Sequence, residues 1–164
     1  MRAGSSRWTR LAVVAVYATA MAVVEAMVVY YLRHLFALQY AAVVSPGRFG
    51  FPQAYLRHEQ VREAATIVML LAVAFLAGRG PLQVLAYFLF AFGVWDIGYY
   101  AGLKIMLDWP ASLATRDLLF LSPHQWWAPV WEPLLASSVF VAVALVLLFR
   151  PQGLIPARGL KERI

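Results

Sequence analysis

Two carboxylic acids interrupt long apolar segments of this chain. Glu25 lies within "LAVVAVYATAMAVVEAMVVYY" and Asp96 within "PLQVLAYFLFAFGVWDIGYYAGL". Ionisable groups at membrane depth are energetically unfavourable, and they commonly bind ligands, pair with other charges or carry protons. We therefore expect Glu25 and Asp96 to hold a ligand, a proton or a cation. The structural alternative is an interhelical hydrogen bond, for Asp96 to Tyr30 or Tyr99, worth about 1 kcal/mol.

Small residues accompany both acids and predict the direction in which they point. Ala18, Ala22 and Ala26 recur every fourth residue on the helix face that also carries Glu25. Gly98 and Gly102 have the same spacing close to Asp96. Small residues let helices approach closely, so both acids are expected to face the interior of a helix bundle, at similar depth.

Further polar residues extend the candidate site. Glu59 and Glu63 lie four residues apart on one helical face, with Arg62 beside them. One interpretation is a local ion pair near a helix start, where acids are favourable. The other adds Glu63 to the inward-facing acids and makes Arg62 an anion clamp or an internal counter-charge. Three residues that follow Asp96 are expected to border the site: Tyr99, Tyr100 and Lys104.

The elements that must position these residues are membrane-spanning helices. Of the 164 residues, 63% are hydrophobic and only 13% are charged, whereas soluble domains carry about 25% charged residues. A helix needs about 20 apolar residues to cross a bilayer. The sequence thus predicts an all-α integral membrane protein, a single membrane domain with four spans in a bundle, at about 11–31, 61–78, 81–103 and 132–149.

The distribution of basic residues predicts an orientation. If both termini are cytoplasmic, eight Lys and Arg residues lie inside and six lie outside, and all three arginines that precede the first span are inside. Cytoplasmic flanks are enriched in Lys and Arg. We therefore expect a multi-pass protein of the plasma (inner) membrane, with outer loops at 32–60 and 104–131. Glu25, Glu63 and Asp96 then line a cup that opens outward.

The second outer loop is expected to cover this cup. It contains four of the six tryptophans, which favour the headgroup region. Asp108 is a candidate N-cap and Pro110 an early helical residue, which predicts a short interfacial or re-entrant helix from about 110 to 121. Such a segment would bring Asp117 and His124 over the cup as a lid.

Several kinds of chemistry are excluded or left without support. The absence of cysteine excludes disulfides, thiolate metal sites and cysteine nucleophiles. The histidines and carboxylates suit zinc, iron or manganese, but no HxxxH, HExxH or ExxH spacing occurs. The sequence thus assigns neither a metal nor a cofactor. The net charge of +6 comes mostly from residues at segment ends, which indicates membrane topology and not nucleic-acid binding.

Three functions remain open at this point. The first is a non-catalytic subunit or assembly factor of a membrane complex, with partner membrane subunits or further copies of itself in the bilayer. The second is a small proton- or cation-coupled carrier, based on the two intramembrane acids. The third is an enzyme that acts on a lipid or headgroup from the outer leaflet, with a desolvated carboxyl as general acid or base.

Overall fold

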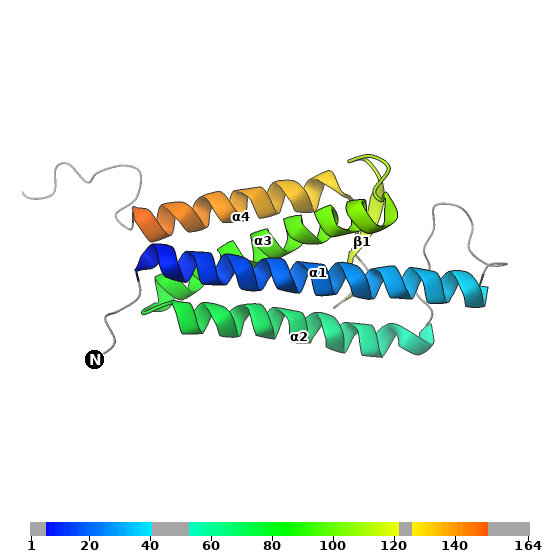
Figure 1. The fold of residues 1–164 in the computed structure, drawn as a ribbon, viewed down its shortest axis with the longest axis horizontal. Coiled ribbons are helices and arrows are strands. Elements are labelled where there is room, and N and C mark those ends of the chain that lie inside the picture. Colours follow the sequence, from blue (N-terminus) through cyan, green and yellow to red (C-terminus); the bar gives the residue numbers. More distant parts are fainter. Residues whose placement is uncertain (1–5, 41–52, 122–125, 151–164) are drawn as a thin grey trace, which may run out of the picture.

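The computed structural model describes residues 6–40, 53–121 and 126–150. Within these ranges the chain forms four long helices: α1 (Arg7–Tyr40), α2 (Gln53–Ala77), α3 (Pro81–Leu107) and α4 (Trp131–Phe149). Figure 1 shows them side by side along the long axis of the molecule. Each contains a stretch that is long and apolar enough to cross a membrane, as the sequence predicts.

The helices extend beyond the predicted spans, so the segment between α1 and α2 is shorter than the predicted first loop. α1 continues to Tyr40 and α2 already begins at Gln53, which converts much of the predicted loop 32–60 into helix. α2 and α3 are joined by a short turn. In that turn, Gly78 donates its N–H to Ala74, and Pro81 occupies the start of α3, a position where the missing N–H of proline costs nothing.

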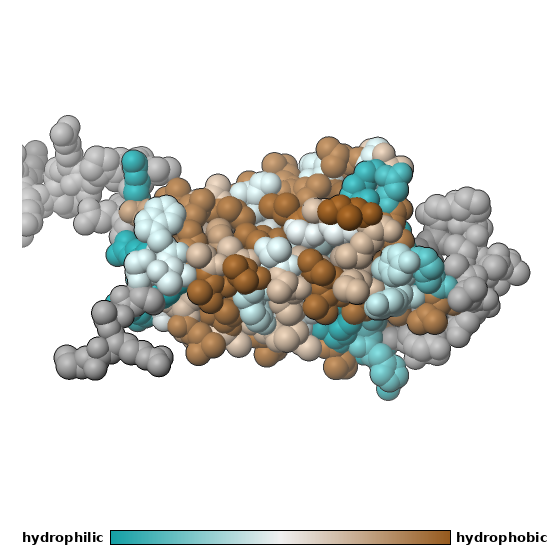
Figure 2. Space-filling view, viewed as in Figure 1, coloured by the Kyte–Doolittle hydropathy of each residue, from teal (hydrophilic) through white to brown (hydrophobic). Residues whose placement is uncertain are grey.

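The outer surface of the bundle is apolar over its middle. Figure 2 shows brown, hydrophobic side chains across the central part of the visible face, with teal residues gathered toward the two ends. Leu76 is 87% exposed and Val16 is 71% exposed. Large contiguous apolar surfaces are rare on soluble monomers, because their exposure to water is unfavourable. Contact with the hydrocarbon of a membrane carries no such penalty.

α3 is the central helix and packs against the other three. Its contact with α1 uses small residues on both sides. Ala22 and Ala26 are buried, and a Cβ added at Gly98 or Gly102 would lie 2.8 Å from the Cβ of Ala22 or Ala26, respectively. The predicted close approach of these small residues is confirmed, and it places Glu25 and Asp96 on neighbouring helices at the same end of the bundle.

Two arginines at the start of α1 tie the opposite end together. Arg7 donates to the carbonyl of Leu148 at 2.9 Å, and Arg10 donates to the carbonyl of Ala77 at 2.6 Å. These are C-terminal carbonyls of α4 and α2, which lack partners within their own helices, and a cation is favourable there. The start of α1 and the end of α4 therefore lie at one end of the bundle (Figure 1).

The segment between α3 and α4 is a β-hairpin, so the predicted short helix at 110–121 is wrong. Strand β1 (Arg116–Phe120) pairs antiparallel with β2 (Trp126–Pro129). Asp108 ends α3 in a left-handed conformation (φ 50°) and does not start a new helix. The pairing of Leu118 with Trp127 across the two strands satisfies backbone groups that a helix would have satisfied within itself. Aromatic and branched side chains also suit strands.

Candidate functional site

A cavity of about 450 Å³ lies at the end of the bundle that carries the hairpin. All four helices and β1 contribute to its walls. Its charged lining residues are Glu25, Arg33, Glu59, Arg62, Glu63, Asp96, Asp117 and Glu132, and its aromatic ones are Phe92, Trp95, Tyr99, Tyr100, Phe120, Trp126 and Phe140. The volume falls in the range of small-molecule sites.

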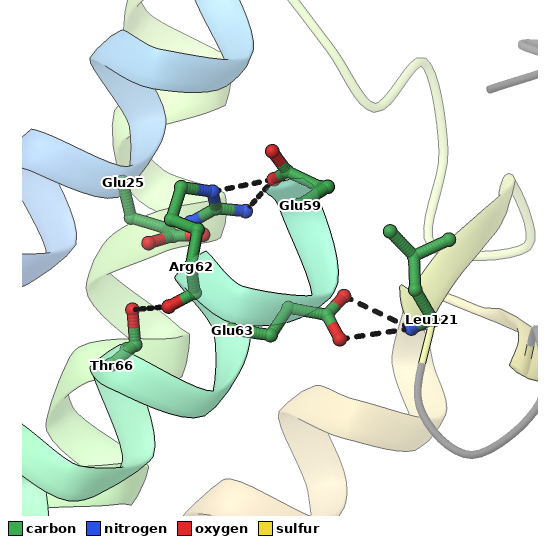
Figure 3. Close-up of polar contacts among 6 residues, drawn as sticks. All are labelled: Glu25, Glu59, Arg62, Glu63, Thr66 and Leu121. Atoms are coloured by element: carbon green, nitrogen blue, oxygen red, sulfur yellow. Dashed lines mark hydrogen bonds and ion pairs between the residues drawn. The ribbon is translucent and has the colours of Figure 1, made fainter. Parts of the chain in front are cut away.

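Arg62 lies between two glutamates, and all three residues line the cavity. Figure 3 shows its guanidinium group between the carboxylates of Glu25 on α1 and Glu59 on α2, with an ion pair to each. The carboxylate side chains of both glutamates are 12% exposed. Thr66 donates its hydroxyl to the Arg62 carbonyl at 3.2 Å. Arg62 is therefore an internal counter-charge, and the cluster retains one excess negative charge when both acids are ionised.

Glu63 points away from this cluster and binds the hairpin. Both of its carboxylate oxygens accept the backbone N–H of Leu121, at 2.9 and 3.1 Å (Figure 3). Gln60, one turn earlier on α2, donates its side-chain amide to the carbonyl of the same residue at 3.2 Å. Leu121 is 3% exposed, so α2 satisfies both backbone groups at the point where β1 ends.

Asp96 is hydrogen-bonded to a residue of α4. Ser137 donates its hydroxyl to Asp96 Oδ2 at 2.8 Å, and Ser137 itself is 1% exposed. Gly93 makes this contact geometrically accessible, because a Cβ at that position would lie only 2.6 Å from the Ser137 carbonyl oxygen. The structural alternative for Asp96, an interhelical hydrogen bond, is therefore present, but its partner is Ser137 and not Tyr30 or Tyr99.

Tyr100 links α3 to the hairpin. Its hydroxyl donates to Asp117 Oδ2 at 3.0 Å, and its ring stacks on Trp109, with centroids 6.3 Å apart. Burial raises the pKa of the Asp117 carboxyl above its ordinary value, although the hydrogen bond from Tyr100 acts in the opposite direction. Asp117 thus lines the cavity as predicted, carried by a strand in place of the expected helix.

Not all of the predicted site residues line the cavity. Lys104 is absent from the cavity wall. Its ammonium group binds Asp108 Oδ1 at 2.6 Å on an exposed surface, and this pairing holds the pKa of Asp108 below its usual range. His124 lies outside the described residues. His34 and His58 are exposed, and neither lines the cavity. Among the described residues, no three His, Asp or Glu side chains are grouped so that they could hold a metal ion.

Ser137 was not among the site residues predicted from the sequence. It occurs in "ASSVF", where two serines interrupt an otherwise apolar span, and hydroxyl groups in such spans commonly hydrogen-bond between helices. That pattern is a usable sign of a partner for a buried acid. No pattern in the sequence indicates that the backbone of Leu121 binds Glu63.

Comparison with known proteins gives no match to any family model, curated protein or solved structure. The interpretation of the cavity therefore depends on its own geometry.

Proposed function

We propose that this chain is a multi-pass protein of the plasma (inner) membrane with both termini in the cytoplasm. In this proposal it is a non-catalytic accessory subunit or assembly factor, and its outward-facing cavity holds a polar or amphiphilic ligand. The observation that carries the proposal is the state of the cavity's acids. Glu25 is paired with Arg62, Glu63 with a backbone N–H and Asp96 with Ser137. Such groups suit a preformed receptor site better than a reactive one.

The absence of a reactive arrangement among the described residues favours binding over catalysis. Ser137 donates to Asp96, but neither described histidine lines the cavity to act as a base for that hydroxyl. Nucleophilic catalysis by serine needs such a neighbouring base. The described residues therefore favour a binding site over an enzyme that acts on lipid.

The exposed face of α4 supports the proposed contact with a partner protein or with another copy of the chain. In the apolar stretch of α4, 17% of the residues are buried, against 39% for α3, so α4 is the span least covered by its own chain. Ser138 and Ala142 are exposed on it four residues apart, beside exposed Val139. This small-residue spacing suits close packing with another membrane helix.

Purification from native membranes in an uncharged detergent tests the proposed accessory role. Native electrophoresis followed by mass spectrometry should show the chain in a complex with another membrane protein or with further copies. Ala142→Leu should shift the chain to its monomeric size because leucine blocks close packing on α4. Val16→Leu, a similar change at an exposed α1 position, should leave the complex intact. A wild-type chain that is monomeric under these conditions contradicts the accessory role.

Single cysteines test the orientation, since the chain has none of its own. Ala111 follows the end of α3, Arg79 precedes its start, and both are exposed. A membrane-impermeant maleimide should label Ala111→Cys in intact cells. It should label Arg79→Cys only after the membrane is opened. The reverse pattern contradicts cytoplasmic termini.

A proton- or cation-coupled carrier is the second candidate. The observation that favours it is that Asp96 and Asp117 line the same cavity, where carboxyls can exchange protons or hold cations. In liposomes, a carrier should lose coupled uptake on Asp96→Asn while keeping its fold. An accessory subunit shows no uptake in either form.

A further inference from the structure

Among the described residues, the acids that line the cavity outnumber the basic side chains there. Six carboxylic acids and two arginines line it. Arg62 is committed to Glu25 and Glu59, and Arg33 lies with its guanidinium carbon 4.2 Å from the ring centre of Trp109. Four carboxyls remain in excess of the arginines. Their field in a site of low polarity attracts a cation and repels an anion.

The remaining lining is apolar and largely aromatic. Phe92, Phe140 and Trp126 line the wall, together with Leu118 and Leu119. Aromatic faces attract ammonium groups, most strongly when water is excluded. Aliphatic and aromatic walls also bind an apolar chain, because its methylene groups are removed from water. The two properties together describe a ligand with a cationic head and an apolar body.

Trp95 provides a second, independent indication that the site is made for a ligand. It lines the cavity, it is 7% exposed, and its indole Nε1 has no hydrogen-bond partner among the described residues. A buried N–H group without an acceptor costs free energy. An oxygen atom on a bound molecule, such as a hydroxyl or an ester carbonyl, would satisfy it.

We infer that the cavity binds a lipophilic cation, namely an amine or quaternary ammonium head on an apolar chain. This inference rests on the proposed role of the cavity as a ligand site. The acids come from every wall, with Glu63 on α2, Asp96 on α3, Asp117 on β1 and Glu132 on α4. A cationic head is therefore surrounded by carboxyls, while its chain contacts the aromatic side chains.

Binding of simple probes to the full chain in maltoside micelles tests the ligand class. Isothermal titration calorimetry with octyltrimethylammonium should show saturable binding beyond that of empty micelles. Octyl sulfate has the same chain with an anionic head and should bind at least tenfold more weakly. Tetramethylammonium has the head without the chain and should also bind at least tenfold more weakly, which separates a free cation from an amphiphile.

Variants locate the binding in the cavity. Asp96→Asn keeps an acceptor for Ser137 and removes the charge, and it should weaken octyltrimethylammonium binding about tenfold. Glu132→Gln provides a second test on another wall, should the first variant fold poorly. Asp108→Asn removes the same charge on the exposed surface and should leave affinity unchanged.

Four results would overturn the inference. They are equal binding of octyl sulfate, equal binding of tetramethylammonium, an equal loss of affinity in the Asp108 variant, and no binding of octyltrimethylammonium. The accessory role is judged separately, by the native complex in membranes, so either proposal can fail while the other holds.

Discussion

Glu63 on α2 accepts the backbone N–H of Leu121 through both carboxylate oxygens, across 58 residues of sequence. This contact joins the end of β1 to α2, a helix long and apolar enough to cross a membrane. Glu63 and residues of β1 both line the cavity, so one carboxylate lines the cavity and anchors the hairpin.

Removal of this carboxylate should loosen the hairpin. Glu63→Ala leaves the buried N–H of Leu121 without its acceptor, a loss of about 1–3 kcal/mol. Hydrogen–deuterium exchange of peptides covering 116–121 should become about tenfold faster, while exchange in α3 stays unchanged. Glu63→Gln keeps one acceptor oxygen and should show a smaller increase. Unchanged exchange in the alanine variant would show that the hairpin is held by other contacts.

Loss of Arg62 should destabilise the whole bundle. Arg62→Leu leaves Glu25 and Glu59 partly buried without their counter-charge, and breaking such a pair costs about 3–5 kcal/mol. Thermal unfolding in detergent should shift markedly to lower temperature. Adding Glu25→Gln to this variant should recover part of the loss, because one unpaired charge is removed.

An exposed ion pair serves as the control for this experiment. Lys104 and Asp108 are 52% and 91% exposed, and surface pairs of this kind contribute little to stability because water screens them. Lys104→Met should therefore leave the unfolding temperature nearly unchanged. An equal shift in the Lys104 and Arg62 variants would refute the internal role of Arg62.

The contact between α1 and α3 should be sensitive to single methyl groups. Gly98→Ala places a Cβ 2.8 Å from that of Ala22, and overpacking of this kind costs about 1–3 kcal/mol. Ala22→Gly in the same chain should restore stability, which a nonspecific effect would not do. Gly80 has an extended conformation with nothing within 4 Å of an added Cβ, so Gly80→Ala should be neutral. Stability is read from thermal unfolding.

Asp117 should make stability depend on pH. Burial raises its pKa in the folded protein above the unfolded value, so its contribution is most favourable below about pH 4, the ordinary Asp value. That contribution is lost as pH rises through the folded pKa. Asp117→Asn cannot ionise and should be more stable than wild type near pH 7, with the difference shrinking as the pH falls. A difference between the two melting temperatures that is constant from pH 4 to 7.5 would contradict this origin.

The least predictable part of the fold is the segment between α3 and α4. Local features such as Asp108 and Pro110 favour a helix start, and the apolar residues after them are compatible with either a helix or a strand. The outcome depends on β2, because Leu118 pairs with Trp127 and Leu121 is bound by Glu63 and Gln60. Trp127 lies on the next strand, and Glu63 and Gln60 are 58 and 61 residues away from Leu121, so no short window of residues contains the information.

The sequence alone determined the four helices that are long and apolar enough to cross a membrane, and the small-residue contact between α1 and α3. Both follow from local rules: apolar runs of sufficient length form spans, and residues four apart share a helix face. Only the tertiary structure decided the partners of the acids. Asp96 meets Ser137 across 41 residues and Glu25 meets Arg62 across 37, because those pairings depend on how closely α3 approaches α4 and α2 approaches α1. Helix depth and rotation, which no single segment encodes, determine those distances.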